Sequence, residues 1–422
     1  MDEHFLHYIW KYQKFTSGDL SLANGSGLTV FYPGNHNMDS GPDFEEARIK
    51  IDNIEWAGQV EIHLRSSDWY HHNHQNDSAY ENVILHVVWE HDKEVKILKE
   101  PIPTLELKHI VDPHLTKKYK HYLQNNDEIL CINQIQKVSP LTLRSMQDRV
   151  LIERLEEKAN SILEKLKVNN NDWEETTYST LAENFGFSTN KESFSRLTQI
   201  LPFRILKKVL NSHDQTEALL FGQTGFLSTD RDEYQCSLRT EHAYLSKKYQ
   251  LSEPMVKAQW KFGKMRPANF PTVRIAQFAS MLSHNPKLFS TLIETTDIKQ
   301  LKKQLLTPVS DYWQNHYDFG KDRNRPSKTI GNGSFVNILI NTVAPLFAAY
   351  SKYSANQEYM DRAVELLESL PAESNRITKK WASTNIKINS AFESQAHIQL
   401  FKHYCQKRRC LHCNIGVEIL NR

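Results

Sequence analysis

Residues 40–92, SGPDFEEARIKIDNIEWAGQVEIHLRSSDWYHHNHQNDSAYENVILHVVWEHD, decide the fold of the first part of this chain. Within them, apolar and polar residues alternate along GQVEIHLR (58–65), which is the pattern of a half-buried β-strand. Because successive side chains of a strand point to opposite faces, Glu61, His63 and Arg65 are expected to lie in a row on one polar face.

Two further strands are predicted within this stretch. Residues 47–52 alternate in the same way, and VILHVVWE (83–90) is apolar on both faces, which is typical of a central strand. Around them the sequence predicts an N-terminal helix that ends before Gly18, a strand at 27–33, a short helix within 68–82 and at most an edge strand at 99–108. The predicted order is therefore helix, three strands, short helix and strand.

From Ser139 onward the pattern changes to helical periodicity. Residues 143–168 are strongly periodic, and Pro140 stands at a favourable first helical position. Further helices are predicted at 173–215, 238–263, 271–306, 334–351, 357–370 and 389–406. The predicted fold class is α+β, with an α/β domain at 1–125 built on a mixed sheet and a helical region at 139–422 that forms one or two domains.

The composition narrows the class of protein. A chain of 422 residues that is 39% hydrophobic is long and apolar enough to bury more than one core. Its formal net charge of +2 provides no global basic field, so any binding of nucleic acid must rest on local patches. Residues 1–15 lack the apolar run of a signal peptide, and the longest apolar run, 336–350, is shorter than the roughly 20 residues of a membrane span. We therefore expect a cytoplasmic protein without a membrane partner.

Asp43, which follows Pro42, and the triplet Glu61-Ile62-His63 lie on successive predicted strands. This arrangement, together with the order of elements, resembles the PD-(D/E)XK nuclease superfamily. The resemblance implies that the Asp43 and Glu61 carboxylates bind Mg²⁺ or Mn²⁺ and that the metal activates water to hydrolyse phosphodiester bonds in DNA or RNA. His63 stands where the superfamily usually has lysine, so it would act as a general base or a third ligand without lysine's fixed positive charge.

The histidine-rich segment after the Glu61 strand allows two interpretations. His74 and Asp77 are candidate metal ligands, because imidazole and carboxylate together suit Zn²⁺ or Mn²⁺. Alternatively the segment is a solvated loop in which Asp77 caps a helix, and this second interpretation is preferred for His71 and His72.

Three of the five cysteines lie close together near the C-terminus, at Cys405, Cys410 and Cys413. Their C-x4-C-x2-C spacing suits Zn²⁺ or an iron–sulfur cluster, and an odd number of cysteines argues against a secreted disulfide framework. The candidates for a fourth ligand are Cys131, Cys236, His403 and His412. The alternative is three buried thiols without a metal.

Substrate contacts are predicted at basic residues. Arg65 shares the polar face of Glu61 and is a candidate phosphate contact. Arg266 and Arg274 lie among the aromatic residues of 260–278, and this combination is able to follow a nucleic-acid backbone while stacking bases. A loop whose aromatic residues belong to the core would have the same pattern, so both interpretations stay open.

Four segments, 41–44, 56–88, 265–277 and 404–416, resemble an uncharacterised family of bacterial proteins typical of Bacteroidetes, a domain of unknown function. They span nearly the whole chain. The resemblance implies one architecture along the sequence, but it brings no activity with it.

The leading hypothesis from the sequence is therefore a metal-dependent, nuclease-like protein that processes nucleic acid. One alternative is a non-catalytic module that binds nucleic acid or protein on a degenerate nuclease fold. Another is a Zn²⁺-dependent hydrolase built on Glu61, His63 and His74.

Overall fold

The structure is a computed structural model that describes residues 2–15, 20–37, 39–97, 99–124, 127–229, 231–295, 297–384 and 386–422. The chain divides into two units. The sheet unit comprises Met1–Met146 and Leu400–Arg422, and the helical unit comprises Gln147–Gln399. The first boundary falls within one long helix, α4 (Pro140–Val168).

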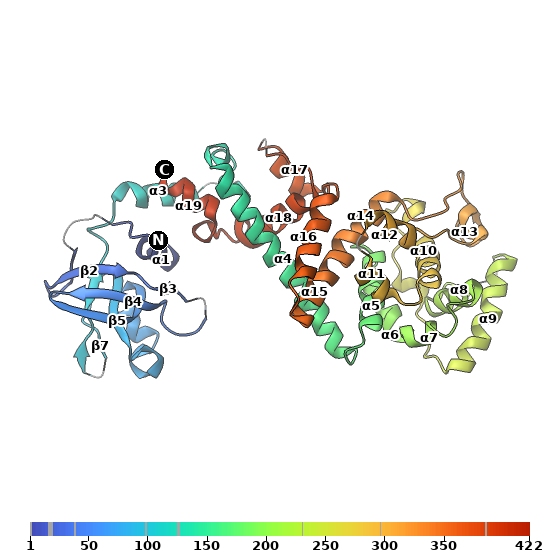
Figure 1. Cartoon of the computed structure of the whole chain (residues 1–422), viewed down its shortest axis with the longest axis horizontal. Helices are drawn as coiled ribbons and strands as arrows, with labels where there is room; N and C mark the ends of the chain where they lie inside the picture. Colours follow the sequence, from blue (N-terminus) through green and yellow to red (C-terminus); the bar gives the residue numbers. More distant parts are fainter. Residues whose placement is uncertain are drawn as a thin grey trace. The chain divides into compact units, whose positions relative to one another are not determined.

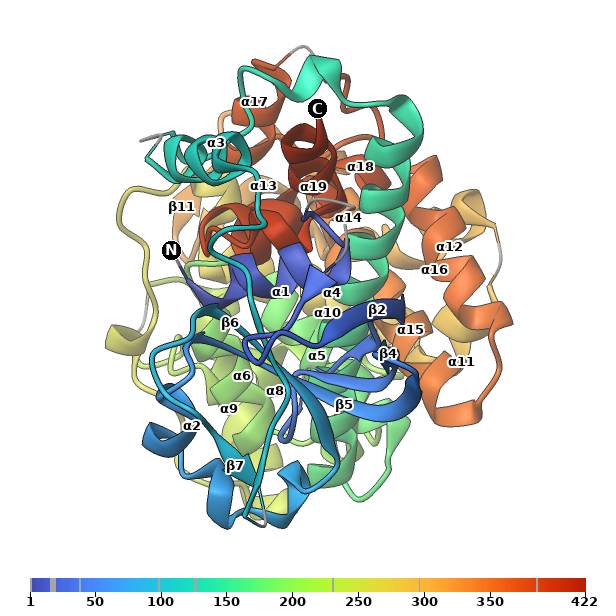
Figure 2. The ribbon, with the colours of Figure 1, turned by 90° about the vertical axis from the view of Figure 1, so that its left-hand side faces the viewer.

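The sheet unit is built on a mixed sheet with the strand order β1-β2-β4-β5-β6-β9, and β3 also pairs with β4. Strands β2, β4 and β5 are antiparallel neighbours, whereas β6 is parallel to β5 and β9 is parallel to β6. Figure 2 shows β4, β5 and β6 side by side. The strands are β1 (Leu20–Ser21), β2 (Gly27–Tyr32), β3 (Asn35–His36), β4 (Phe44–Ile51), β5 (Ile54–Arg65), β6 (Val83–Glu90), β7 (Lys96–Ile97), β8 (Glu100–Pro101) and β9 (Thr104–Glu106).

Helices precede, interrupt and follow this sheet. They are α1 (Glu3–Lys11), α2 (Asp68–His71), η1 (His74–Asn76), η2 (Ser78–Tyr80), α3 (Pro113–Leu123), η3 (Ile135–Lys137), η7 (Phe401–Cys405), η8 (Cys410–His412) and α19 (Asn414–Asn421). The observed order α1, β2, β4, β5, α2, β6 matches the predicted order of elements, and the α+β fold class is confirmed. Helix α1 ends at Lys11. The sequence predicts that this helix ends before Gly18, which lies outside the described residues.

Two apolar clusters fix the faces of β5. Phe5 and Ile9 of α1 lie in the main core with Val60 and Ile62, so the apolar face of β5 packs with this helix. Asp2 caps α1, since its carboxylate accepts a hydrogen bond from the Phe5 amide at 3.0 Å. Trp69 of α2 is fully buried in a second cluster, and its ring centroid lies 6.5 Å from that of His63. The polar face of β5 is therefore covered by the segment that follows it.

A β-bulge between β4 and β5 sets which residues lie opposite each other at the site. From Ile51 back to Ala47, each step along β4 matches one step along β5, and Ala47 pairs with Gly58. Phe44 then pairs with Val60, so three steps along β4 lie opposite two steps along β5. The extra residue of this bulge is Glu46, whose φ is 57°. Continuing the ladder places Asp43 opposite Glu61, whereas an unbroken register would place Phe44 there.

The helical unit consists mainly of helices with one small hairpin. Figure 1 shows these helices after α4, coloured from green through yellow to orange and red. The elements are α5 (Trp173–Phe185), α6 (Lys191–Ile200), α7 (Phe203–Leu206), α8 (His213–Gln223), α9 (Glu233–Tyr249), η4 (Lys257–Gln259), η5 (Pro267–Asn269), α10 (Pro271–His284), α11 (Leu288–Glu294), α12 (Ile298–Leu305), α13 (Asp311–Asn315), β10 (His316–Asp318), β11 (Lys321–Asp322), α14 (Asn332–Ile338), η6 (Leu339–Val343), α15 (Ala344–Ser354), α16 (Glu358–Ser369), α17 (Arg376–Ala382) and α18 (Ala391–Leu400).

The prediction of a helix at 238–263 is wrong for its second half. Helix α9 ends at Tyr249 because Gln250 adopts a left-handed conformation with φ 51°, and Pro254 follows shortly after. Among the described residues, one helical stretch, Asn332–Ser354, is long and apolar enough to cross a membrane, and 67% of its most apolar window is buried inside the structure. The absence of a membrane partner stays a prediction.

The bulge offers a direct test of this register. Glu46→Val should lower the stability of the β4–β5 ladder by about 1–2 kcal/mol relative to Glu46→Gly, because a left-handed conformation is strained for a branched residue and open to glycine. Native-state hydrogen exchange of the β4 and β5 amides measures this difference. Glu45→Val is the matched control and should leave exchange unchanged, since the neighbouring Glu45 is exposed and does not have a positive φ. Equal protection in the Gly and Val variants would contradict the assigned bulge.

Candidate metal site on the sheet

The carboxylates of Asp43 and Glu61 are each held by the backbone of the other's strand. The Asp43 amide donates to Glu61 Oε2 at 3.1 Å, and the Ile62 amide donates to Asp43 Oδ2 at 2.9 Å. The Glu61 side chain is only 6% exposed. Burial, and then the negative charge of Asp43, raise the pKa of Glu61 to about 9. A bound cation would reverse this effect, because it stabilises two carboxylates that otherwise repel each other.

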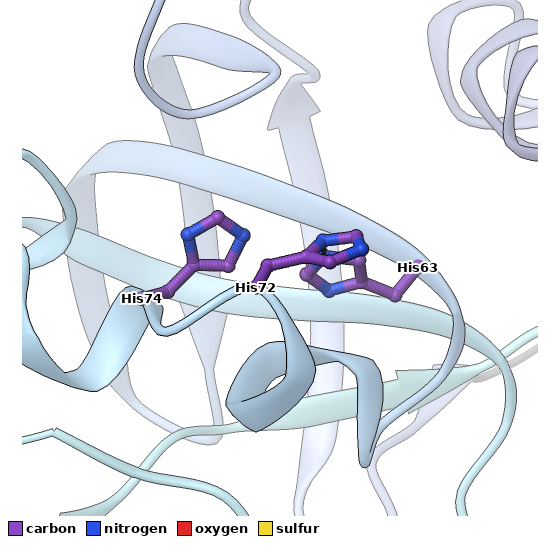
Figure 3. Close-up of side chains that lie close together, drawn as sticks. All are labelled: His63, His72 and His74. Atoms are coloured by element: carbon purple, nitrogen blue, oxygen red, sulfur yellow. Dashed lines mark hydrogen bonds between the residues drawn. The ribbon is translucent and has the colours of Figure 1, made fainter.

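Three imidazoles gather beside Glu61. One ring nitrogen each from His63, His72 and His74 lies within 4.8 Å of the others, and Figure 3 shows these side chains converging from β5 and from the segment after α2. His63 Nε2 is 3.0 Å from His72 Nδ1. Glu61 Oε1 lies 3.5 Å from His63 Nε2 and 3.4 Å from His74 Nε2.

The backbone of the α2–η1 segment explains how His72 and His74 reach the same site. Asn73 between them adopts a left-handed conformation with φ 61°, which asparagine tolerates better than most residues. The chain therefore reverses within one residue. The His74 ring stacks on Tyr80 at a centroid distance of 3.9 Å, and buried Trp69 holds α2 against the sheet.

Two histidines form a buried pair behind the site. His63 Nδ1 lies 2.9 Å from His86 Nε2, and both side chains are almost inaccessible to solvent. Burial, followed by neighbouring imidazoles, lowers the pKa of His63 to about 2 and that of His86 to about 3, so both rings are neutral. If His63 Nδ1 donates to His86, the Nε2 lone pair points to the site. A ligand histidine is commonly oriented by such a second hydrogen bond.

Three separations between these groups are close to those within a tetrahedral metal site. Zinc–nitrogen bonds of about 2.0–2.1 Å place neighbouring ligand atoms roughly 3.3–3.5 Å apart in a tetrahedron. The three separations are 3.0 Å between His63 Nε2 and His72 Nδ1, 3.5 Å between Glu61 Oε1 and His63 Nε2, and 3.4 Å between Glu61 Oε1 and His74 Nε2. His74 Nε2 is buried and has no hydrogen-bond partner within the part of the chain that the structure describes. A nitrogen-rich set of this kind suits Zn²⁺ or Mn²⁺ better than Mg²⁺, which prefers oxygen.

Helix α1 adds two groups to the site. His7 Nε2 lies 3.3 Å from Asp43 Oδ2. Burial raises the pKa of Glu3, and its carboxylate interacts with both His72 and Asp43. By the resemblance to the nuclease superfamily, Glu3 corresponds only weakly to the acidic residue that some members carry on their first helix, and His7 was not predicted from the sequence. Glu3 and His7 are four residues apart, and residues four apart lie on one face of a helix. This spacing is the sequence signal that could have identified the pair.

The other predicted residues of the sheet unit lie at the margin of this group. Asp77 is exposed, and its carboxylate caps η2 by accepting the Ala79 amide at 3.0 Å. Arg65 is exposed at the end of β5 and pairs in register with Glu90. The hydrogen bond and charge of Lys108, and to a smaller extent the charge of Arg65, lower the pKa of Glu90. The structure therefore brings together Asp43, Glu61, His63 and His74 from the prediction and adds His72, for which the sequence favoured a solvated loop.

Arg266 and Arg274 lie in the helical unit. Arg266 is exposed before η5. Arg274 is 5% exposed, and burial lowers its pKa to about 10. Its guanidinium donates to Asn269 at 2.6 Å, to Gln277 at 2.9 Å and to Ser334 at 3.0 Å. These bonds give Arg274 a role within the fold of the helical unit.

The cysteines Cys405, Cys410 and Cys413 all lie in the sheet unit, as does Cys131, whereas Cys236 lies in α9 of the helical unit. All five are free thiols. Of the two cysteines considered as a fourth ligand, Cys131 lies in the same unit as Cys405, Cys410 and Cys413.

Comparison with known protein families gives one match. The sequence profile of a family described as "Protein of unknown function (DUF2851)" matches residues 3–376. The chain belongs to the DUF2851 family. No curated protein and no solved structure matches the chain. The resemblance to a domain-of-unknown-function family is confirmed over this range, and the segment 404–416 lies beyond it.

The metal site makes a prediction that separates two adjacent histidines. His72→Ala should weaken Mn²⁺ binding by at least about 100-fold, because it removes one of the clustered nitrogens. His71→Ala is the matched control, since its side chain is 73% exposed and pairs with Asp68. Electron paramagnetic resonance of free Mn²⁺ measures the affinity, and thiols do not compete strongly for this ion. Equal affinities in the two variants would remove His72 from the site.

Proposed function

We propose that this DUF2851 protein is a metal-dependent hydrolase that cleaves phosphodiester bonds of nucleic acid at the site on β5. The observation that carries the proposal is the convergence of one ring nitrogen each from His63, His72 and His74 within 4.8 Å of one another, with Glu61 Oε1 3.4–3.5 Å from two of these rings. The proposal takes its metal ligands from the Zn²⁺-hydrolase alternative and its substrate class from the nuclease resemblance.

The residues of the site divide into holding and positioning roles. A bound Zn²⁺ or Mn²⁺ supplies a Lewis acid and lowers the pKa of water. The three imidazoles would hold the ion with Glu61 beside them, and His86 would keep the His63 ring oriented through its Nε2. Asp43 keeps Glu61 Oε2 occupied by its own backbone amide, so Oε1 is directed toward His63 and His74.

Access to the site comes from the side of His72. His63 and Glu61 are buried, His74 is partly buried and His72 is exposed, so solvent reaches the group from one direction. A site with three imidazoles at its base and one open side leaves room for a substrate oxygen, as catalytic zinc sites do.

Two exposed cations support an anionic substrate. The ring centroid of His36 lies 5.2 Å from that of His7. The pKa of His36 is lowered to about 4 by burial and then by the charges of His7 and Lys11. The pKa of His412 is also lowered to about 4, by burial and then by the charges of His4 and Arg409. Lys11 and Arg409 are exposed, so their charges are free to meet phosphate near the site.

Hydrolysis is tested by cleavage assays on single- and double-stranded DNA and RNA with Mn²⁺, Zn²⁺ or Mg²⁺. Glu61→Gln and His74→Ala should each reduce the cleavage rate by about 100-fold or more, since His74 holds the ion and Glu61 is the carboxylate beside it. His71→Ala should cleave like the wild type. Cleavage that is equal in all variants would refute the proposed site, and binding of metal and nucleic acid without cleavage would favour the non-catalytic alternative.

The substrate class is tested separately. The double variant Lys11→Ala, Arg409→Ala should bind oligonucleotides more weakly and reduce the salt-dependence slope of log K by about 1.8, at about 0.9 per phosphate contact. Mn²⁺ affinity should stay unchanged in this variant. A salt slope identical to that of the wild type would exclude these cations as phosphate contacts.

A further inference from the structure

A pocket of the sheet unit lies between helix α3 and the end of strand β6. Its volume of about 480 Å³ is within the range of roughly 300–1,000 Å³ that is typical of small-molecule sites. Trp89 of β6, Val111 and Pro113 line it together with Lys117 and Lys120 of α3, and we call it the α3 pocket. All of its lining residues belong to the sheet unit.

The α3 pocket is separate from the candidate metal site, because the two lie on opposite faces of β6. His86 of β6 points to the metal site, where its Nε2 lies 2.9 Å from His63 Nδ1. Trp89 is three residues further along the strand, so its side chain points to the other face. There it packs against the main core, which also contains Phe5 of α1. A ligand of the α3 pocket would therefore leave the metal site free.

One wall of the pocket is apolar and aromatic. The Trp89 side chain is partly exposed, and Val111 and Pro113 extend the apolar surface beside it. The Trp89 carbonyl accepts the Lys108 amide at 3.2 Å, which holds the end of β6 against the segment that leads to α3. A fixed indole ring of this kind is a surface on which a nucleobase stacks, since every base has a π-face.

The other wall carries positive charge. Lys117, Lys120 and His121 line the pocket and are exposed, and their spacing makes them neighbours on one face of α3. Tyr119 and Tyr122 are buried on the same helix and fix its orientation. Among the described residues, no aspartate or glutamate lines the pocket. The charge of the pocket therefore favours an anionic ligand.

Two of the three lysines of the pocket remain available for this ligand. Lys108 forms an ion pair with Glu90 at 2.8 Å, so its charge is partly offset. Lys117 and Lys120 provide two positive charges beside each other on α3. A phosphate monoester carries about −1.5 to −2 charges at pH 7, whereas a phosphodiester carries one. Two lysines thus match a terminal phosphate better than a phosphate within a nucleic-acid chain.

We infer that the α3 pocket binds a free nucleoside monophosphate, with the base stacked on Trp89 and the phosphate held by Lys117 and Lys120. The combination of a largely apolar cavity with a few convergent polar groups is typical of a small-molecule site. The inference does not depend on hydrolysis at the β5 site, since the pocket lies on the other face of the sheet.

Isothermal titration calorimetry of the whole chain with AMP, CMP, GMP and UMP tests this inference, with EDTA present so that divalent metals do not contribute. At least one nucleotide should bind about 10-fold or more tightly than its nucleoside and than inorganic phosphate, because only the nucleotide engages both walls. A protein that binds none of the four, or that binds inorganic phosphate as tightly as the nucleotides, would overturn the inference.

Variants of each wall assign the binding to this pocket. Trp89→Leu should weaken nucleotide binding by about 10-fold or more because it removes the stacking surface, whereas Trp89→Phe should retain most of it. The double variant Lys117→Ala, Lys120→Ala should lose a similar factor, and its substituted side chains are exposed, so the core stays intact. Its matched control is Lys96→Ala, Lys137→Ala, which removes the same charge from exposed positions outside the pocket. Wild-type affinity in Trp89→Leu or in the pocket lysine variant would overturn the assignment.

Discussion

The arrangement of the sheet unit depends on the crossed hydrogen bonds between Asp43 and Glu61. Each carboxylate accepts an amide of the opposite strand, and a hydrogen bond to a charged group contributes about 1.5–3 kcal/mol. Removing a carboxylate from water costs several kcal/mol, so these bonds only partly offset the burial of Glu61. The remaining cost explains why the pKa of Glu61 is raised, and a divalent cation is the partner that would remove it. A local conflict of this kind is expected at functional sites.

The sequence predicted the sheet because its strands obey simple periodicity, and it predicted that Glu61 and His63 share a face. Two features escaped it. The bulge at Glu46, which aligns Asp43 with Glu61, has no signal in the alternation pattern, since glutamate is not a residue that marks a left-handed conformation. The reversal at Asn73, which lets His72 and His74 reach the same site, could not be predicted because a polar segment rich in histidine is also typical of a solvated loop.

The candidate metal site on β5 offers imidazole nitrogens beside the Glu61 carboxylate, a set that borderline ions such as Zn²⁺ and Mn²⁺ accept. The site is exposed to solvent through His72, whereas His63 is buried.

The C-terminal segment shows why sequence order alone does not define the units. The helical pattern before it led the sequence prediction to group it with 139–422, yet residues 400–422 belong to the sheet unit. An amphipathic helix shows that it has a partner but does not identify it. Here the partner is the start of the chain, since Leu411 and Leu420 share a core with Phe5, and Tyr8 donates to Asn421 Oδ1 at 2.6 Å. Apolar packing is not directional by itself, so the hydrogen bond from Tyr8 and the one from Lys118 to the Ile419 carbonyl at 2.9 Å are what fix the position of the segment along the core.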